Sequence, residues 1–173
     1  KVCIVGGSFG MSGAAAIMAK SALRSGSGLV RAAIPESILP IVAAIEPSYT
    51  TTPLKEDEQG RISKKALATI LDLIPENDCL AIGPGLGKTN DLKIIIEKII
   101  AQKDLNLVLD ADGLNNLSKI KCWQKLIKAN ITLTPHPGEM KRLYSSVFRK
   151  KMPDDRVEKA ARLANETKTI VVL

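Results

Sequence analysis

The chain has 173 residues, of which 45% are hydrophobic, and a formal net charge of +7 at pH 7. This length suits one domain with a buried core, and no apolar run is long enough to span a membrane. The start lacks the pattern of a secretion signal. Three widely spaced cysteines without a C-x-x-C pair, together with a single histidine, argue against a zinc site. They predict reduced thiols in a cytoplasmic protein.

The positive charge is concentrated in the second part of the chain. Residues 1–118 contain 12 basic and 13 acidic side chains, whereas residues 119–168 contain 13 basic and 5 acidic ones. A basic region can attract nucleic acid or a phosphorylated small molecule. Proteins that bind single strands stack bases on aromatic side chains, which form only 3% of this sequence. We therefore expect an anionic small molecule and no nucleic acid.

Apolar runs and helical patterns alternate along the chain. In the first half, strands are predicted at residues 2–5, 29–34, 49–54 and 79–82. Helices are predicted at residues 14–23, 35–46 and 63–74. Pro35 suits the first position of its helix, and Ser63 suits an N-cap. The acidic, glycine-containing residues 55–61 predict a surface loop.

The second half continues the alternation. Strands are predicted at residues 105–109, 131–134 and 169–173, and helices from about Asn90, near Asn116 and Trp123, through residues 140–144, and from residue 153 to 164. Because the strands are apolar throughout, we predict a parallel sheet covered by helices on both faces, in one domain of residues 1–173. A buried strand at the last residues predicts that part of a larger domain is missing.

Two glycine-rich loops follow predicted strands. Residues 6–13 contain neither G-x-G-x-x-G nor the lysine of a P-loop, so their glycines either let backbone N–H groups approach an anion or let helix and strand pack closely. Residues 83–89 read G-P-G-L-G-K-T, which is one residue short of a P-loop because glycine would be needed at Ile82. This second loop either admits a ligand or is a plain turn.

Acidic residues end another strand, at Asp110 and Asp112. Because both carboxylates lie at a strand end, we expect one to face the cleft while the other caps the next helix. Asp112 could hold a substrate hydroxyl or a hydrated magnesium ion. The alternative is that both acids are helix caps.

The only histidine lies in a stiff turn between a strand and a helix. His136 stands between Pro135 and Pro137, which cannot donate backbone hydrogen bonds and so end the strand. A histidine at the carboxyl end of a parallel strand can orient a polar substrate or exchange protons near neutral pH. Alternatively, it is a surface histidine, and Glu139 is a first-turn acid that offsets the helix dipole.

Five motifs carry a resemblance when they are taken together. They are G-G-S-F-G-M-S-G-A-A, A-L-R-S-G-S-G-L-V, A-I-G-P-G-L-G, V-L-D-A-D-G-L-N and L-T-P-H-P-G-E-M, in this order across nearly the whole chain. The sequence resembles the ADP- or ATP-dependent NAD(P)H-hydrate dehydratases. The resemblance implies an α/β fold, the ribokinase-like three-layer αβα sandwich with a mostly parallel central sheet, incomplete at the C-terminal end.

The resemblance also implies a reaction and its site. Family members use ADP or ATP, with Mg²⁺, to dehydrate the S form of NADH or NADPH hydrate, and often form homotetramers. By position, the hydrate site would include Ala14, Gly87 and Asp112. It would also include the loop formed by Thr134, Pro135, His136, Pro137, Gly138, Glu139 and Met140. No residue of the chain is expected to bind a metal by itself.

The family's nucleotide site is not represented in these residues. Members continue into K-G-x-x-T and G-S-G-D-type motifs, which hold the nucleotide phosphates and supply the aspartate expected to act as general base. We expect these beyond Leu173, so no catalytic residue is assigned. Two alternatives remain: a vitamin-precursor kinase of the same fold, or a non-catalytic remnant that binds dinucleotide. L-T-P-H-P-G-E and D-A-D-G-L-N together favour the dehydratase.

Overall fold

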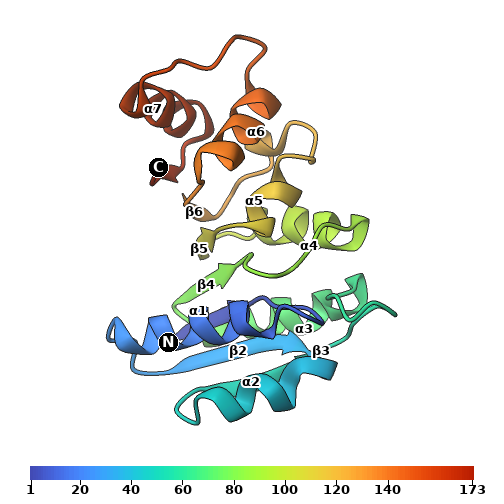
Figure 1. The fold of residues 1–173 in the computed structure, drawn as a ribbon. Coiled ribbons are helices and arrows are strands. Elements are labelled where there is room, and N and C mark those ends of the chain that lie inside the picture. The colour runs from blue at the N-terminus through green and yellow to red at the C-terminus, as the bar shows by residue number, and fades with distance from the viewer.

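The computed structural model describes all residues from Lys1 to Leu173. A seven-stranded sheet runs through it in the order β3-β2-β1-β4-β5-β6-β7, and every neighbouring pair is parallel (Figure 1). The strands are β1 (Val2–Val5), β2 (Val30–Pro35), β3 (Thr50–Leu54), β4 (Cys79–Ile82), β5 (Asn106–Leu109), β6 (Asn130–Leu133) and β7 (Ile170–Val171). The predicted parallel sheet is confirmed.

Seven α-helices connect the strands. They are α1 (Ser12–Arg24), α2 (Leu39–Ile45), α3 (Leu67–Leu73), α4 (Asn90–Ile100), α5 (Asp112–Leu117), α6 (Pro137–Val147) and α7 (Arg156–Thr167). Short 3₁₀ turns occupy Glu36–Ile38, Lys64–Ala66, Ile74–Glu76 and Trp123–Lys125. None of the helices combines the length and the apolarity that a membrane crossing requires.

The chain changes direction across the sheet at β1. From β1 it proceeds through β2 to the edge strand β3, and then returns past β1 to β4 and onward to β7. Right-handed crossovers then place α1 and α2 on one face and the later helices on the other. Two separate cores reflect this: a smaller one contains Ile4, Ala15 and Val42, and a larger one contains Leu80, Ile96 and Leu133. The result is three layers, αβα.

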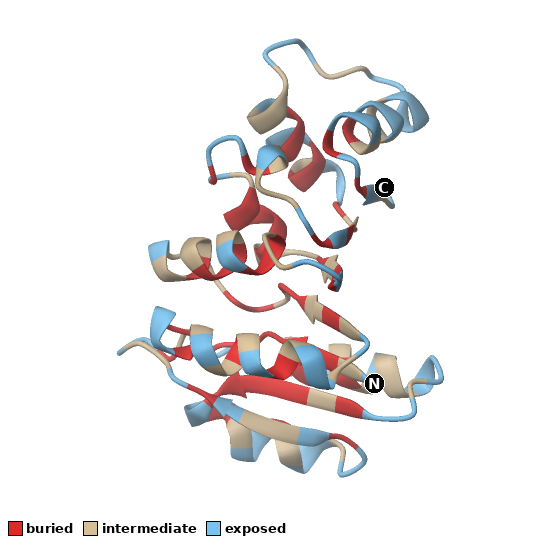
Figure 2. Cartoon of the chain, turned by 180° about the vertical axis from the view of Figure 1, so that it is seen from behind, coloured by how far each residue is buried: buried red, intermediate tan, exposed pale blue.

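The face under α1 and α2 is covered only at one end. One row of register partners crosses it: Ala32, Ile4, Ala81, Val108, Thr132 and Ile170. Ala32 and Ile4 are at most 1% exposed, Val108 and Thr132 are half-buried, and Ile170 is 64% exposed (Figure 2). Within these residues, helices therefore cover both faces around β1 and β2 and one face of β5, β6 and β7.

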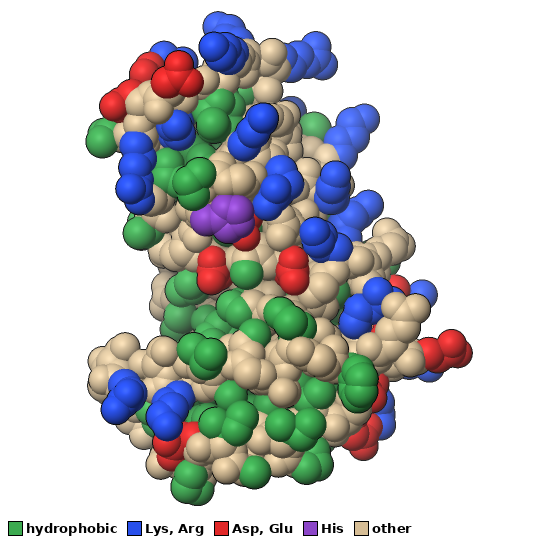
Figure 3. Space-filling view, in the orientation of Figure 1, with side chains coloured by type: hydrophobic (Ala, Val, Ile, Leu, Met, Phe, Trp, Pro, Cys, Tyr) green, Lys and Arg blue, Asp and Glu red, His purple; other side chains and the backbone are tan.

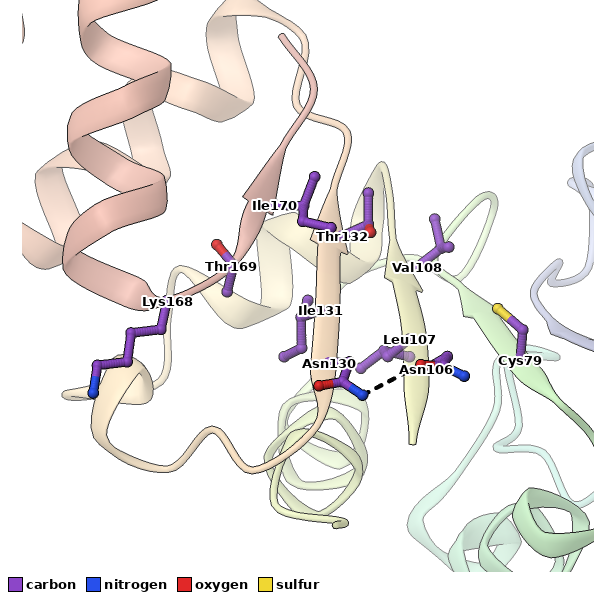
Figure 4. A pocket seen from close by; sticks show the side chains of 10 residues that line it. All are labelled: Cys79, Asn106, Leu107, Val108, Asn130, Ile131, Thr132, Lys168, Thr169 and Ile170. Carbon is purple, nitrogen blue, oxygen red and sulfur yellow. Dashed lines mark hydrogen bonds between the residues drawn. The ribbon is translucent and has the colours of Figure 1, made fainter. Parts of the chain in front are cut away.

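A shallow hollow of about 390 Å³ lies over this uncovered area (Figure 4). Asn106 and Asn130 border it at the amino ends of β5 and β6, where the Asn130 side-chain amide donates to Asn106 Oδ1 at 3.3 Å. Ligand sites of parallel sheets lie at the opposite, carboxyl ends of the strands. The hollow is thus a consequence of incomplete coverage and lies apart from the predicted site.

Three local predictions need correction. Pro35 ends β2 instead of opening an α-helix. Ser63 does not cap a helix, because its hydroxyl donates to the Lys55 carbonyl at 3.2 Å. The Lys64 N–H is bound by Asp91 of α4 instead, at 2.8 Å. The last strand is not buried: β7 comprises only Ile170–Val171, and Ile170 is 64% exposed.

Candidate functional site

Four loops meet at the carboxyl edge of the sheet. They follow β1, β4, β5 and β6, which are neighbours and all run in the same direction. The Gly7 N–H donates to the Pro84 carbonyl at 2.9 Å, and the Thr134 N–H donates to the Leu109 carbonyl at 3.2 Å. The four loops therefore line one edge, and the loops that carry Gly87 and His136 flank the loop after β5.

The first glycine loop packs against the second. The buried Ser8 hydroxyl donates to the Gly85 carbonyl at 2.7 Å. A Cβ on Gly85 would lie 2.9 Å from the Ala14 Cβ, closer than side chains pack. Ala14 is half-buried in the first turns of α1 and lies directly against this loop. Of the two readings of the first loop, these contacts favour close packing.

The loops after β4 and β5 also approach each other closely. A Cβ on Gly83, whose φ is +147°, would lie 1.8 Å from the Asp110 carbonyl oxygen, so only glycine fits there. The next residue, Ala111, has φ +48° and ψ −119°, a strained conformation for a residue with a side chain. Such strain persists only where the surroundings impose it, as they do between these two loops.

The peptide of Gly87 is held on both sides by α5. Its N–H donates to Asp112 Oδ2 at 2.9 Å, and its carbonyl accepts from the Asn116 side chain at 2.9 Å. Asn116 is only 3% exposed, so this link is shielded from water. The residue before α5 is Ala111, and no side chain caps the helix. The interpretation of both acids as helix caps is therefore wrong. Asp112 instead holds the loop after β4 against α5 through its hydrogen bond with Gly87.

His136 is the N-cap of α6, and its own loop holds the imidazole. Nδ1 accepts from the Gly138 N–H at 3.0 Å, and Nε2 lies 3.1 Å from Glu139 Oε1. The other Glu139 oxygen accepts from the His136 N–H at 3.0 Å, completing a capping box. Both ring nitrogens therefore face groups of the chain itself. A ligand would meet the ring face of a side chain that is 63% exposed.

The remaining residues of this loop differ in what they can contact. Thr134 is half-buried and donates from its hydroxyl to the Leu109 carbonyl at 3.3 Å, while Pro135 is buried. Pro137 is exposed and opens α6. Met140 is 0% exposed and belongs to the larger core, so its side chain cannot line a surface site. Its inclusion among the site residues is corrected for that reason.

Sequence reasoning did not single out Asn115, Asn116 or Arg142. Arg142 Nε donates to Asn115 Oδ1 at 2.8 Å, and the Asn115 amide donates to Asp112 Oδ1 at 3.1 Å. The two asparagines follow D-A-D-G-L directly, and Arg142 follows Gly138 by one helical turn. Helical spacing could therefore have placed Arg142 on the face of Gly138, but the bond between α5 and α6 depends on the tertiary structure.

An ion pair borders the site beside Gly87. Arg61 and Asp57 form a salt bridge at 2.8 Å, and Arg61 Cδ lies 3.4 Å from the position that a Gly87 Cβ would occupy. Burial alone would raise the pKa of the Asp57 carboxyl, but hydrogen bonds from Arg61 and Gln59 outweigh it and lower the pKa. Asp57 is thus ionised at neutral pH and keeps Arg61 next to the loop.

The charge around the site is uneven. In Figure 3 the single histidine, in purple, lies on the face in view with Lys and Arg side chains above and beside it, and acidic side chains just below. The basic part of the sequence, residues 119–168, forms the helices and loops on that side (Figure 1). An anionic ligand that reaches the histidine would therefore be attracted from that side.

The residues of the site do not form a metal centre of their own. No three His, Cys, Asp or Glu side chains are grouped so that they could hold an ion. Asp112, the predicted contact for hydrated magnesium, already accepts hydrogen bonds at both oxygens, from Gly87 and Asn115. These bonds suit a structural role, in which Asp112 holds the loop after β4 against α5.

Comparison with known sequences identifies relatives of the whole chain. A family model described as NAD(P)H-hydrate dehydratase matches residues 2–173. A bifunctional NAD(P)H-hydrate repair enzyme of Moorella thermoacetica is 36% identical over 173 residues, which are 100% of this chain and 32% of that protein. An ADP-dependent (S)-NAD(P)H-hydrate dehydratase of Xanthomonas campestris is 33% identical over 142 residues, 81% of this chain and 46% of that protein.

Solved structures agree on the fold. A ribokinase-like superfamily protein from Enterococcus faecalis superimposes with a TM-score of 0.78 at 19% identity, covering 99% of this chain and 56% of that one. An ADP/ATP-dependent NAD(P)H-hydrate dehydratase from Bacillus subtilis, co-crystallised with ATP/Mg²⁺, gives 0.73 at 26% identity, covering 99% and 57%. The fold is therefore ribokinase-like, as expected.

The chain spans about a third of the length of the Moorella relative and little more than half of the Bacillus structure. Within that span, the family match runs through all four loops of the carboxyl edge, from the glycine loop after β1 to the histidine loop after β6. The chain belongs to the NAD(P)H-hydrate dehydratase family.

Proposed function

We propose that this chain acts in the nucleotide-dependent dehydration of the S form of NADH or NADPH hydrate, which restores the usable cofactor. In this reaction ADP or ATP transfers a phosphoryl group to the hydroxyl of the hydrate, and phosphate is then eliminated. Family membership supports the reaction, and the names of the Xanthomonas and Bacillus relatives describe it for those proteins. We propose the same activity for the protein to which these residues belong.

The observation that carries the proposal is the shared edge of four parallel strands. Gly87 is held in place by Asp112 and Asn116, and the loop of His136 is next along the same edge. A bare glycine peptide, an exposed imidazole face and nearby positive charge suit a large, flat, anionic ligand such as a nicotinamide dinucleotide. We therefore propose Ala14, Gly87, Thr134, Pro137 and Gly138 as surroundings of the hydrate and His136 as one wall.

The nucleotide site is a separate matter. We propose ADP or ATP as co-substrate, with Mg²⁺ neutralising the charge of the phosphates when it is bound. The K-G-x-x-T and G-S-G-D-type motifs implied by the resemblance do not occur in residues 1–173. The residues in hand would therefore bind and orient the hydrate, and we assign none of them as the general base.

We also propose the domain, the cellular compartment and the oligomeric state. Residues 1–173 would form part of one dehydratase domain, in keeping with the single sheet and with relatives that are longer than the chain. The three cysteines are free, which is consistent with the reducing cytoplasm. A homotetramer is expected from the family resemblance, and size-exclusion chromatography with light scattering measures it directly.

A turnover assay tests the proposed function. The purified protein receives hydrated NADPH and ADP, or ATP, and the recovery of NADPH is followed by absorbance. Phosphorylation of a hydroxymethylpyrimidine or a thiazole alcohol instead would identify a vitamin-precursor kinase. Binding of NADPH without turnover of any of these substrates would identify a dinucleotide-binding remnant.

The first prediction concerns the imidazole. We expect His136→Ala to lower kcat/KM for the hydrate about tenfold or more, while the KM for the nucleotide stays nearly level, because the ring contacts only the hydrate. Both constants are measured with one substrate varied at a time.

A matched variant separates the ring from the helix cap. His136→Asn removes the imidazole but leaves a side chain that caps α6 well, whereas His136→Ala also loses about 1 kcal/mol of stability with the cap. We expect both variants to use the hydrate poorly. Full activity of His136→Asn would remove the ring from the hydrate site and leave His136 with a capping role alone.

A further inference from the structure

Arg142 carries a positive charge that the protein does not neutralise. Its side chain is exposed on α6, and its Nε donates to Asn115 Oδ1 at 2.8 Å. It takes part in none of the salt bridges of the structure, and its terminal Nη groups donate no hydrogen bond. The guanidinium is therefore held at one nitrogen and free at the other two.

Asn115 determines where that guanidinium points. The Asn115 side chain is largely buried, with the residue 9% exposed, and its amide nitrogen donates to Asp112 Oδ1 at 3.1 Å. The amide oxygen must then face away from Asp112, and this oxygen receives Arg142. A neutral amide thus stands between the carboxylate and the guanidinium, so that Arg142 is oriented by Asp112 without pairing with it.

The same network reaches the proposed hydrate site at both ends. The other oxygen of Asp112 holds the Gly87 N–H at 2.9 Å. At the far end, Arg142 Nη1 lies 3.7 Å from the Cβ position of Gly138, and His136 Cε1 lies 2.8 Å from that same point. The guanidinium and the imidazole are therefore neighbours across Gly138, and a continuous chain of hydrogen bonds links Gly87 to Arg142.

We propose that Arg142 binds a phosphate group of the dinucleotide hydrate, and that Asn115 and Asp112 are the residues that position it. The planar fork of an arginine matches two phosphate oxygens, and a charge-assisted pair of this kind is among the stronger hydrogen bonds of proteins. The inference rests on the proposed function, because it names the part of that substrate which the basic side of the site receives.

Isothermal titration of the protein with NADPH, NADH and ADP tests the assignment. We expect Arg142→Ala to weaken NADPH binding about tenfold, since a hydrogen-bonded ion pair is lost. Arg142→Lys keeps the charge but loses the fork and is expected to recover part of the affinity. Asn115→Ala removes the acceptor that orients the Arg142 guanidinium, and it is expected to weaken NADPH binding about threefold.

The control removes an equal charge elsewhere in the basic region. Lys128 is exposed just before β6, at the amino end of the strand, and Lys128→Ala is expected to leave the dissociation constant for NADPH unchanged. A general attraction by the basic region would instead weaken binding equally in Lys128→Ala and Arg142→Ala. That result would overturn the assignment, as would unchanged NADPH binding by a folded Arg142→Ala protein.

The three ligands also separate the possible phosphates. A loss for NADPH that exceeds the loss for NADH places Arg142 at the 2′-phosphate, and equal losses place it at the diphosphate bridge; either supports the proposal. A loss for ADP alone would overturn it and assign Arg142 to the nucleotide. If the unaltered protein binds ADP but neither dinucleotide, the proposed function fails, and this inference fails with it.

Discussion

The two ends of the sheet differ in how many of their faces are covered. Around β1 and β2, helices pack on both sides, and the row of side chains through Ala32 and Ile4 is excluded from water. At β5 and β6 the continuation of that row, Val108 and Thr132, is half-buried, because only the opposite face has helices. Both ends nevertheless contribute loops to the same carboxyl edge.

Because of this difference in coverage, the two sides of the proposed site are held in place in different ways. The glycine loops after β1 and β4 are packed against each other and rest on the doubly covered end. The histidine loop after β6 is fixed differently, by its capping box and by the bond from Arg142 to Asn115. We conclude that burial makes one side of the site rigid, while a polar network does so on the other.

The largest expected effect is a loss of stability when a charge is placed on the sheet face under α1 and α2. Ala32→Asp would bury an unpaired carboxylate between β2 and the helices α1 and α2, and should cost more than about 4 kcal/mol of unfolding free energy. Thr132→Asp, in the same row at β6, should cost less than about 1 kcal/mol, since water reaches it. Urea unfolding measures both. Equal losses would mean that a further layer covers β5 and β6.

A smaller effect is expected from valine at two glycines with positive φ, one outside the proposed site and one within it. Gly26, after α1, has φ +98° and Gly87, after β4, has φ +77°. Valine at either position should cost about 2 kcal/mol, because a branched side chain disfavours the left-handed region. Thermal unfolding should therefore show similar losses.

Only one of the two valine variants should affect ligand binding. Nothing lies within 4 Å of a Cβ at Gly26, whereas at Gly87 it would meet Arg61 at 3.4 Å and occupy the bare loop of the proposed site. Titration with NADPH should thus detect weaker binding by Gly87→Val and normal binding by Gly26→Val. Normal binding by Gly87→Val would place the ligand away from this loop.

The smallest effect concerns the thiols of β1 and β4. Burial raises the pKa of Cys3 to about 12, and burial also raises the pKa of Cys79. The unfolded thiol ionises near pH 8.5, so the stability due to the neutral Cys3 is complete below that pH and is lost as the pH rises toward 12.

We therefore expect the unaltered protein to lose about 1 to 2 kcal/mol more than Cys3→Ala between pH 8.5 and pH 10. Urea midpoints at the two pH values give this difference, and Cys79→Ala, at the half-buried position, should change the slope less. An identical slope in all three proteins would mean that water reaches Cys3, against the double coverage of β1.

Local patterns predicted most of the elements and failed where distant groups compete. Cys79–Ile82 and Asn106–Leu109 were recognisable from their apolar runs. Ser63 has the chemistry of an N-cap, yet its hydroxyl is taken by Lys55, and Asp91 from another helix binds the free N–H. The coverage of a strand face was likewise invisible, because an apolar run does not reveal which of its two sides has a helix.

By itself, the sequence determined the alternation of strands and helices, the ends of the strands at glycine and proline, and the family motifs, all of which depend on residues close along the chain. Only the tertiary structure decided that Asp112 holds Gly87, that Asn115 directs Arg142, and that Met140 belongs to the core. The physical reason is distance along the chain. These contacts join residues 25 to 27 positions apart on separate elements, and they form only when neighbouring parallel strands bring their loops to one edge.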